Sequence, residues 1–310
     1  MEAERRGIGD MFAEFIFTPA ESKLLIATAV SEMELVKNAM KNGIVAMHPS
    51  SSTHFLSRIL NGGKDHSGKV WVTGTVVPKG LCVDARTGAG TGQLTKSLAD
   101  PGKYPHTVVF YKGELQSGWT IYDLCEKMGP GDLYIKGVNA VDAAHTTGVL
   151  LGSMVDGTIG KMVETRKQKG FSILVPVGLE KLIPGTIEEA ASFISCPKDY
   201  SMGVKCRLFP LKADVTVTEV EALELISGGG SARVFSCGGL NGAEGAVSIA
   251  LQGTEEQVSR AITVCEQIKG NAELPSVVSP ACMTCKMPTC YQGGKRKPWV
   301  QDASDEQTEL

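Results

Sequence analysis

The sequence predicts an α/β protein, in which an open, mostly parallel sheet with flanking helices is followed by a smaller α+β domain. Three observations support this fold class. Apolar segments with strand patterns alternate with amphipathic segments along most of the chain, as in sheets built from β-α-β units. The 310 residues include 36 glycines, which are spread between the apolar segments where turns are needed. Residues 171–177 are almost continuously apolar, which is typical of a strand buried on both faces.

The overall composition excludes several classes of protein. Hydrophobic residues make up 42% and charged residues 21% of the chain, which is the balance of a globular protein rather than a disordered one. The net charge of −3 and the pI near 6.0 give no reason to expect a nucleic-acid partner. No apolar run reaches the ~18 residues that a membrane span requires, and the charged N-terminus does not fit a secretory signal. We therefore expect a cytoplasmic protein with no membrane partner.

The first elements are specified by local signals. Thr18 and Glu21 form a capping box, and apolar residues then recur every three or four positions, which predicts a single helix that ends at Gly43. A short apolar strand over 44–47 follows. The turn after this strand leads into a second, shorter helix, which ends at the Asn-Gly-Gly sequence of residues 61–63.

Strands and helices continue to alternate through the first two thirds of the chain. We predict strands over 70–77, 107–111, 133–135 and 171–177, and helices over 120–128, over 156–170 and from Thr186 onward. The last of these helices begins with another capping box, which Thr186 forms with Glu189. This alternation favours parallel strands joined by right-handed crossovers.

A change in composition near 196–200 marks a linker between two predicted domains. Beyond it we predict a strand over 204–211, a helix over 218–227, strands over 232–236 and 246–251, a helix over 254–269 and a strand over 273–278. This β-α-β-β-α-β order is that of a ferredoxin-like domain. The chain is therefore expected to divide into a ligand-binding domain (1–198), a ferredoxin-like domain (199–280) and a cysteine-containing C-terminal tail (281–310).

The clearest candidate ligand site is a run of four hydroxyl side chains after the strand over 44–47. Ser50, Ser51, Ser52 and Thr53 lead into a helix N-terminus, where free backbone N–H groups and the helix dipole favour an anion such as a phosphate. One of these hydroxyls could simply cap the helix, but four exceed what a cap requires. We expect this run to bind a ligand.

Two further predicted strand ends carry polar residues at the same edge of the sheet. Gly137, Asn139 and Asp142 follow the strand over 133–135. Asn139 could hold sugar hydroxyls and Asp142 could move a proton between adjacent carbons, although both are also common turn formers. Lys181 follows the most buried strand and could supply a positive charge to a phosphate, but a solvated surface lysine would look the same. The candidate ligand-binding residues are completed by Gly157 and Thr158, at the start of a predicted helix.

The nine cysteines do not fit a disulfide framework, because their number is odd and six of them are scattered through apolar or mixed segments. The other three, Cys282, Cys285 and Cys290, lie close together in the tail. Thiolates at this spacing can converge on one ion, so the tail could hold zinc or an iron–sulfur cluster with a fourth ligand from elsewhere. The alternative is a disordered tail with incidental cysteines.

Three stretches of the first predicted domain resemble one known superfamily. They are residues 43–53 (GIVAMHPSSST), 132–142 (DLYIKGVNAVD) and 171–181 (FSILVPVGLEK). With them, the region from about Glu21 to Ile183 is similar to the ISOCOT superfamily, which has the NagB/RpiA/CoA-transferase-like fold. The resemblance is nearest to the effector-binding domains of DeoR-type sugar regulators, although no helix-turn-helix pattern precedes Thr18. It implies that the hydroxyl run grips a phosphate and that Lys181 faces the ligand. Asn139 departs from the pattern, because the related methylthioribose-phosphate isomerases have a catalytic aspartate there.

These observations lead to one expected function and two alternatives. We expect the protein to bind a small phosphorylated metabolite, by its resemblance a sugar phosphate. If it is an enzyme, the resemblance implies an isomerisation, with Asp142 as base and Lys181 as charge stabiliser. The first alternative is a non-catalytic metabolite sensor or assembly subunit, whose ferredoxin-like domain mediates oligomerisation. The second is a metal or redox protein that acts through Cys282, Cys285 and Cys290. A homo-oligomer is the expected assembly.

Overall fold

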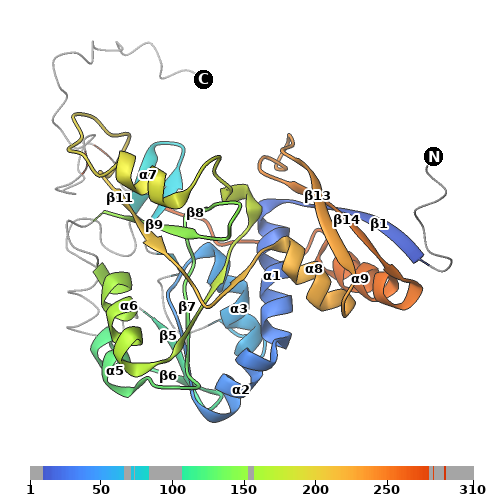
Figure 1. The fold of residues 1–310 in the computed structure, drawn as a ribbon, viewed down its shortest axis with the longest axis horizontal. Helices are drawn as coiled ribbons and strands as arrows, with labels where there is room; N and C mark the ends of the chain where they lie inside the picture. The colour runs from blue at the N-terminus through green and yellow to red at the C-terminus, as the bar shows by residue number, and fades with distance from the viewer. Residues whose placement is uncertain are drawn as a thin grey trace.

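The computed structural model describes residues 10–65, 71–72, 74–83, 107–152 and 157–278, and in addition Cys282 and Cys290. Over these residues the chain has a mixed α/β fold, with a six-stranded sheet on one side of helix α1 (Pro19–Glu32) and a three-stranded sheet on the other (Figure 1). The predicted α/β class is therefore confirmed. The sheet, however, is mixed rather than mostly parallel.

The six-stranded sheet combines four parallel strands with an antiparallel pair. In spatial order its strands are β12 (Val215–Val217), β10 (Ser172–Pro176), β7 (Leu133–Ile135), β2 (Ile44–Met47), β5 (Val108–Tyr111) and β6 (Glu114–Gln116). The first four run parallel, so their carboxyl ends share one edge of the sheet. Strand β5 runs antiparallel to both β2 and β6.

Helices bury both faces of this sheet. Helices α1 and α3 (Ser51–Leu60) cover one face, and α5 (Ile121–Lys127) and α6 (Gly157–Lys169) cover the other. Strand β2 shows the result, because Val45 and Met47 pack into the first core while Ile44 and Ala46 pack into the second. A strand that is apolar at every position is what burial on both sides requires.

The helix predicted from Thr18 to Gly43 is two helices. Helix α1 begins with the predicted capping box of Thr18 and Glu21 and stops at Met33, which has an extended backbone (φ −64°, ψ 135°). Helix α2 (Glu34–Asn42) then runs to Gly43 and contacts β2 and β5. Glu21 has a second role, since its carboxylate also accepts hydrogen bonds from the Lys269 ammonium and the Gly270 N–H after the last helix. The cap therefore joins the start of α1 to the segment that follows the last helix.

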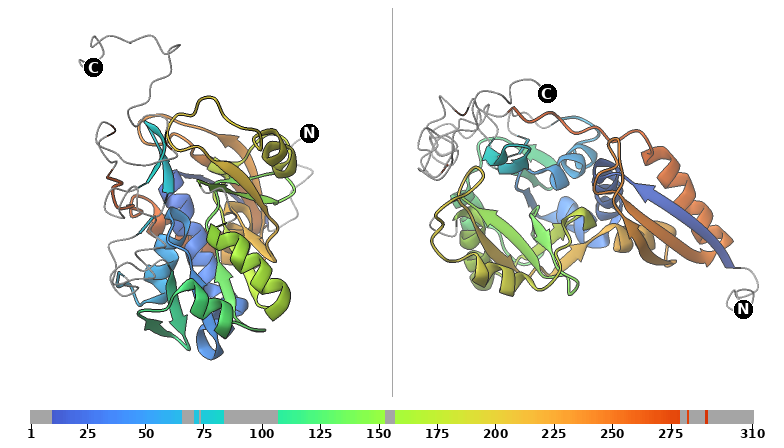
Figure 2. Two further views of the ribbon diagram at one scale, coloured as in Figure 1. Left: turned by 90° about the vertical axis from the view of Figure 1, so that its left-hand side faces the viewer. Right: turned by 90° about the horizontal axis from the view of Figure 1, so that it is seen from above.

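The second sheet has a strand that the sequence analysis did not predict. In spatial order it contains β1 (Asp10–Phe17), β14 (Val247–Thr254) and β13 (Ser231–Cys237), and helices α8 (Glu219–Ser227) and α9 (Glu255–Ile268) pack against it. Strand β1 is antiparallel to β14, with Phe17 opposite Val247. The right-hand view in Figure 2 shows the blue N-terminal strand alongside the orange C-terminal strands.

The ferredoxin-like arrangement predicted for residues 199–280 is therefore wrong. Its first predicted strand forms β11 (Arg207–Leu211), which pairs with β9 (Thr147–Leu151). Strand β9 pairs on its other side with β8 (Ala140–Val141), and this sheet packs against helix α7 (Ile187–Phe193). Residues 273–278 contain no strand. Strand β1 pairs with β14 instead, because Phe15 and Phe17 add apolar surface to the core under the sheet of β1, β14 and β13.

Strands from either side of the predicted boundary at residue 198/199 also pair with each other. Strand β11 joins β9, and β12 joins β10 in the six-stranded sheet. One hydrophobic core extends from α1 through Val217 to the second sheet. A further hairpin, β3 (Gly74–Val77) with β4 (Gly80–Val83), is antiparallel, and Leu81 in β4 also forms an isolated bridge with Gly203. Of the predicted tail, Cys282 and Cys290 belong to the described residues.

Within the part of the chain that the structure describes, none of the helices combines the length and the apolar character needed to traverse a bilayer.

Candidate functional site

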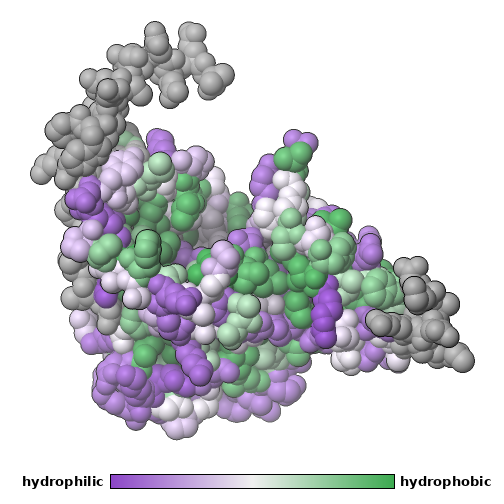
Figure 3. Space-filling view, turned by 45° about the horizontal axis from the view of Figure 1, so that its top comes forward, coloured by the Kyte–Doolittle hydropathy of each residue, from purple (hydrophilic) through white to green (hydrophobic). Residues whose placement is uncertain are grey.

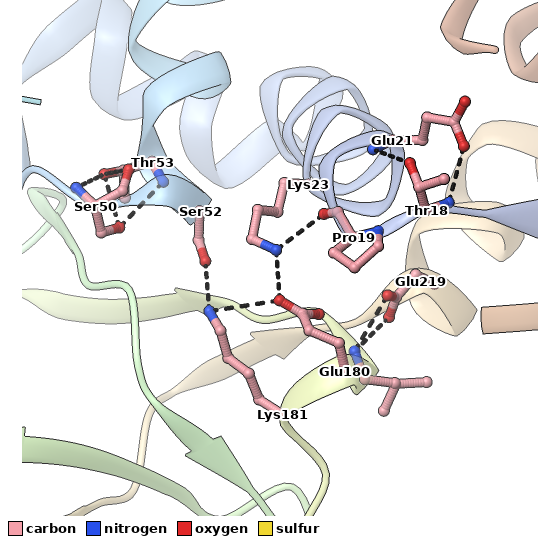
Figure 4. A network of polar contacts seen from close by, with 11 residues as sticks. Thr18, Pro19, Glu21, Lys23, Ser50, Ser52, Thr53, Glu180, Lys181 and Glu219 are labelled. Carbon is pink, nitrogen blue, oxygen red and sulfur yellow. Dashed lines mark hydrogen bonds and ion pairs between the residues drawn. The ribbon is translucent and has the colours of Figure 1, made fainter. Parts of the chain in front are cut away.

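Charged side chains converge at the edge where the four parallel strands end. The segment after β2 supplies Ser52, the one after β10 supplies Glu180 and Lys181, and the one after β12 supplies Glu219, while α1 adds Lys23 (Figure 4). The segment after β7 adds Lys136, which lies near enough to Lys181 for the two charges to interact. We refer to these six residues as the lysine cluster. Ligands of open α/β sheets bind at this edge, so the topology itself marks the cluster as a candidate site.

A contact between Lys181 and Ser52 joins the segment after β10 to the segment after β2. Lys181 ends the short 3-10 turn η2 (Leu179–Lys181) after β10, and Ser52 lies in the first turn of α3. The Lys181 ammonium donates to the Ser52 Oγ at 3.1 Å (Figure 4). The predicted approach of Lys181 to the hydroxyl run is therefore confirmed.

Glu180 bridges two ammonium groups. Its Oε1 accepts a short hydrogen bond from Lys23 and lies 3.9 Å from the Lys181 Nζ, while the Lys23 ammonium also donates to the Pro19 carbonyl at 2.9 Å (Figure 4). Lys23 and Glu180 are 6% and 13% exposed, so the pair is largely shielded from water. The other oxygen of Glu180, Oε2, is buried and accepts no hydrogen bond from the described residues.

Lys136 follows β7 directly and is only 6% exposed. Its backbone N–H donates to the Leu174 carbonyl at 3.0 Å, which fixes the residue to the neighbouring strand. Burial, with a further contribution from the Lys181 charge, lowers the pKa of Lys136 to about 7. An amine in this state is neutral in a large fraction of molecules at neutral pH, so Lys136 can act as a base or a nucleophile.

The pKa of Lys181 is also lowered, to about 8, because burial disfavours its charge and Lys23 repels it, against the attraction of Glu180 and Glu219. Glu219 shows the opposite shift for the same physical reason. Its side chain is fully buried, and burial together with the Glu180 charge raises its pKa to about 7. Several groups of the lysine cluster therefore change charge near neutral pH, as functional sites commonly require.

Glu219 and Gly178 hold the η2 turn in place. Both carboxylate oxygens of Glu219 accept from the Leu179 N–H, at 3.1 and 2.9 Å. Gly178 lies directly under Glu180, since a Cβ built on it would be 1.8 Å from the Glu180 Oε2. A glycine at this position lets the carboxylate fold back over the backbone toward Lys23.

The lysine cluster lies at the foot of the hairpin between β13 and β14. A Cβ built on Gly245, in the loop of that hairpin, would be 3.3 Å from the Glu180 Cβ. Figure 3 shows that the surface is hollowed between this projecting hairpin and the side of the molecule that carries α7 and β11. Glu180 and Lys181 are half-buried rather than buried, so the cluster retains contact with solvent.

The remaining hydroxyls of the predicted run form a helix cap. The Ser50 Oγ accepts from the Thr53 N–H at 3.2 Å, and the Thr53 Oγ1 accepts from the Ser50 N–H at 3.1 Å. The Thr53 hydroxyl also donates to the His48 carbonyl at 2.7 Å. Ser51 is the half-buried first residue of α3. Capping thus explains Ser50 and Thr53, and Ser52 is the member of the run that belongs to the cluster.

Gly137 is important for its lack of a side chain. A Cβ built on it would be 2.2 Å from the Ser50 Oγ, so the end of β7 lies tightly against the turn before α3. Gly157 and Thr158 begin α6, whose buried residues pack with α5 on the second core. The residues just before them lie outside the described ranges.

Asp142 and Asn139 have structural hydrogen bonds that the sequence analysis did not foresee. The Oδ1 of Asp142 accepts from the N–H groups of Ala144 and Thr146, both at 2.9 Å, and its Oδ2 accepts from the Ile187 N–H at 3.0 Å. The Asn139 Oδ1 accepts from the Leu150 N–H at 2.9 Å. The base role predicted for Asp142 therefore has no support, because its carboxylate closes a turn and anchors the start of α7.

The predicted metal site cannot be followed in full, because Cys285 lies outside the described residues. Cys290 pairs with Val204 in an isolated bridge, and Cys282 is half-buried. Among the residues that the structure describes, no group of three or more histidine, cysteine or acidic side chains is arranged to hold a metal ion.

Sequence reasoning missed four members of the cluster, namely Lys23, Lys136, Glu180 and Glu219. A signal existed for Lys136, since a lysine directly after a buried parallel strand falls at the ligand-binding edge. Glu219 is the first residue of α8 and Lys23 is the fifth residue of α1, and charged side chains near helix starts are ordinarily solvated. Their burial depends on contacts between distant segments, which no local pattern shows.

Comparison of the chain with known protein families, with curated proteins and with solved structures finds no significant match.

Proposed function

We propose that the protein binds a small phosphorylated metabolite, of the sugar-phosphate class, at the lysine cluster and transfers a proton on it, as in an isomerisation. The observation that carries this proposal is the contact between Lys181 and Ser52 beside the buried amine of Lys136. The resemblance of the strand ends to the ISOCOT superfamily supports the choice of a sugar phosphate, and the chemistry of the residues supports the reaction class.

The cluster is suited to an anion because its positive groups outnumber its negative ones. Lys23 and Lys181 both lie against the single carboxylate of Glu180, while burial brings the pKa values of Lys136 and Glu219 to about 7. The N-terminus of α3 adds its dipole next to Ser52. A phosphate held by Lys181 and Ser52 would favour the charged form of Lys181 and so raise its pKa above about 8. Ligand binding should therefore be accompanied by proton uptake near neutral pH.

Isomerisation of a sugar phosphate needs a base for the carbon-bound proton and a positive group for the oxyanion that forms. Glu180 takes the role of base in place of Asp142, because its Oε2 is buried without a hydrogen-bond donor among the described residues. Lys181 keeps the role of charge stabiliser. Both side chains follow β10, so the two groups lie on one short, anchored turn.

The test is a thermal-shift screen of the full chain with inorganic phosphate and a panel of sugar phosphates, followed by an exchange assay on each ligand found. A saturating ligand should raise the melting temperature, since binding stabilises the folded state by RT ln(1 + [L]/Kd). Incorporation of solvent deuterium at a substrate carbon would then demonstrate proton transfer.

Two variants make the screen specific. Lys181→Met should lose the stabilisation, whereas Lys167→Met, at an exposed lysine on α6, should keep it. Saturable binding without deuterium incorporation would support the non-catalytic sensor instead of the isomerase. If no phosphorylated compound stabilises the wild-type chain, the proposal is wrong.

A further inference from the structure

The three lysines of the cluster differ in their partners. Lys23 is bound to Glu180 and to the Pro19 carbonyl, and Lys181 is bound to Ser52. The ammonium of Lys136 has no hydrogen-bond or ion-pair partner within the described part of the chain, although the residue is 6% exposed. An amine without a partner gains nothing from being charged, so burial acts on it without compensation.

We propose that Lys136 is a covalent nucleophile, whose amine forms an imine with the carbonyl carbon of a phosphorylated aldehyde or ketone held beside Lys181. This inference deepens the proposed function and rests on it, because the same cluster would bind the phosphate. It names the substrate class more closely, as one that carries a carbonyl group in addition to the phosphate.

The position of Lys136 supports this role. Its backbone is fixed on one side by the hydrogen bond to Leu174 and on the other by Gly137, which lies against Ser50. A nucleophile on such a rigid strand end is held in one place relative to the phosphate-binding groups. Lys181 lies close enough for its charge to act on Lys136, and a neighbouring cation is one known means of keeping a lysine neutral.

The reaction balances without an oxidant or a reductant. The lone pair of the neutral Nζ forms a bond to the carbonyl carbon, and the electron pair of the C=O π bond moves to the oxygen. The nitrogen loses a proton and the oxygen takes up protons, one of them from the Lys181 ammonium, so that water leaves. The product is a protonated imine between Lys136 and the substrate carbon. This cation makes the adjacent C–H more acidic, so that the base of the proposed isomerisation, Glu180, can remove the proton.

The experiment uses the full chain with glycolaldehyde phosphate as probe and sodium cyanoborohydride to reduce any imine to a stable amine. Intact-mass measurement counts the labels, and peptide mapping locates them. Glycolaldehyde, which lacks the phosphate, is the matched probe. Lys136→Met and Lys136→Arg remove the nucleophile, the first without and the second with a positive charge, and Lys167→Met is the control at an exposed lysine.

We expect one label per chain at neutral pH, located at Lys136 and absent from both Lys136 variants. Its rate should be at least about ten-fold above that at Lys167, because the neutral fraction of an amine rises about ten-fold for each unit by which its pKa falls. The rate should also increase with pH up to about 7, where Lys136 titrates, rather than up to the range of exposed lysines.

The outcomes separate this inference from the proposed function. If glycolaldehyde phosphate labels only surface lysines, or labels folded Lys136→Arg as fast as the wild type, the imine proposal is overturned even when phosphate binding holds. If both probes label Lys136 at the same rate, the nucleophile is confirmed but the phosphate site is not. Circular dichroism of each variant shows that it is folded before labelling is compared.

Discussion

The ammonium of Lys181 and the hydroxyl of Ser52 lie 3.1 Å apart although 129 residues separate them in the sequence. One residue ends the turn after β10 and the other begins α3 after β2, so the contact spans the carboxyl ends of the parallel strands. It places a positive charge, a hydroxyl and a helix N-terminus at one point. This combination is what a phosphate group requires.

The hydroxyls of the serine run should differ in their effect on ligand binding. Ser52→Ala removes the hydroxyl that contacts Lys181, and a hydrogen bond to a charged group contributes roughly 1.5–3 kcal/mol, so affinity for a phosphorylated ligand should fall about ten-fold or more. Ser51→Ala should have a smaller effect, because no contact joins Ser51 to Lys181 in the described structure. Isothermal titration of the two variants checks this, and equal losses would contradict the assignment of Ser52.

Lys136→Met should stabilise the protein in a pH-dependent way. Burial lowers the pKa of Lys136 from 10.5 to about 7, so the folded state binds this proton less tightly than the unfolded state does. The buried amine therefore lowers the free energy of unfolding of the wild type by its full amount below about pH 7. This loss disappears as the pH rises toward 10.5. The variant should therefore be more stable by up to roughly 3–5 kcal/mol at about pH 6 and nearly equal at about pH 10.

Urea unfolding of both proteins at several pH values measures this difference. Met has a similar length and no charge, so it can occupy the same buried position. A stability difference that does not depend on pH would show that the amine of Lys136 is not held in its neutral form.

Gly178→Ala should damage the cluster without unfolding the chain. The backbone of Gly178 (φ −78°, ψ 145°) is open to any residue, but the added Cβ would displace the Glu180 carboxylate from its place over the turn. Lys23 would lose its partner while remaining buried, which costs on the order of 1–3 kcal/mol. We expect a modest fall in stability and a large fall in turnover. Gly129→Ala is a suitable control, because open space surrounds Gly129. Gly185→Ala is unsuitable, because the backbone φ of Gly185 is +95°, where alanine is strained.

Asp142→Asn should act on stability and not on ligand binding. The amide keeps one oxygen to accept from the turn but loses the carboxylate oxygen that accepts from the Ile187 N–H, so unfolding should require about 1–3 kcal/mol less. Folded Asp142→Asn should bind a phosphorylated ligand with unchanged affinity. Loss of turnover at full stability and full affinity would instead restore Asp142 as the catalytic base.

Several of the elements that carry the site could be predicted from the sequence because their signals are local. The capping boxes at Thr18 and Thr186 and the strand, turn and helix from Ile44 to Leu60 involve residues only a few positions apart, and each is present in the structure. The approach of Lys181 to the hydroxyl run followed from the rule that parallel strands share one carboxyl edge.

Which strands pair in a sheet, and which charged side chains form ion pairs, could not be predicted in the same way. Strand β1 has apolar residues on both faces, with Phe12 and Ile16 exposed and Phe17 buried, so its alternation is weak and its pairing with β14 is set by tertiary contacts. Strand β11 has an ordinary strand pattern. The pattern predicts a strand, but it does not show whether the strand pairs with β9 or with β14. The buried Lys23–Glu180 pair looks in the sequence like two solvated charges, and only the packing of α1 against η2 distinguishes it.

The most direct test of the central claim is the affinity of Lys181→Met for a phosphorylated ligand identified in the thermal-shift screen, measured by isothermal titration beside the wild type and Lys167→Met. The account predicts that Lys181→Met binds at least about ten-fold more weakly, since it loses a charged hydrogen bond, while Lys167→Met binds as the wild type does. Equal affinity of all three proteins would contradict the placement of the phosphate at the lysine cluster.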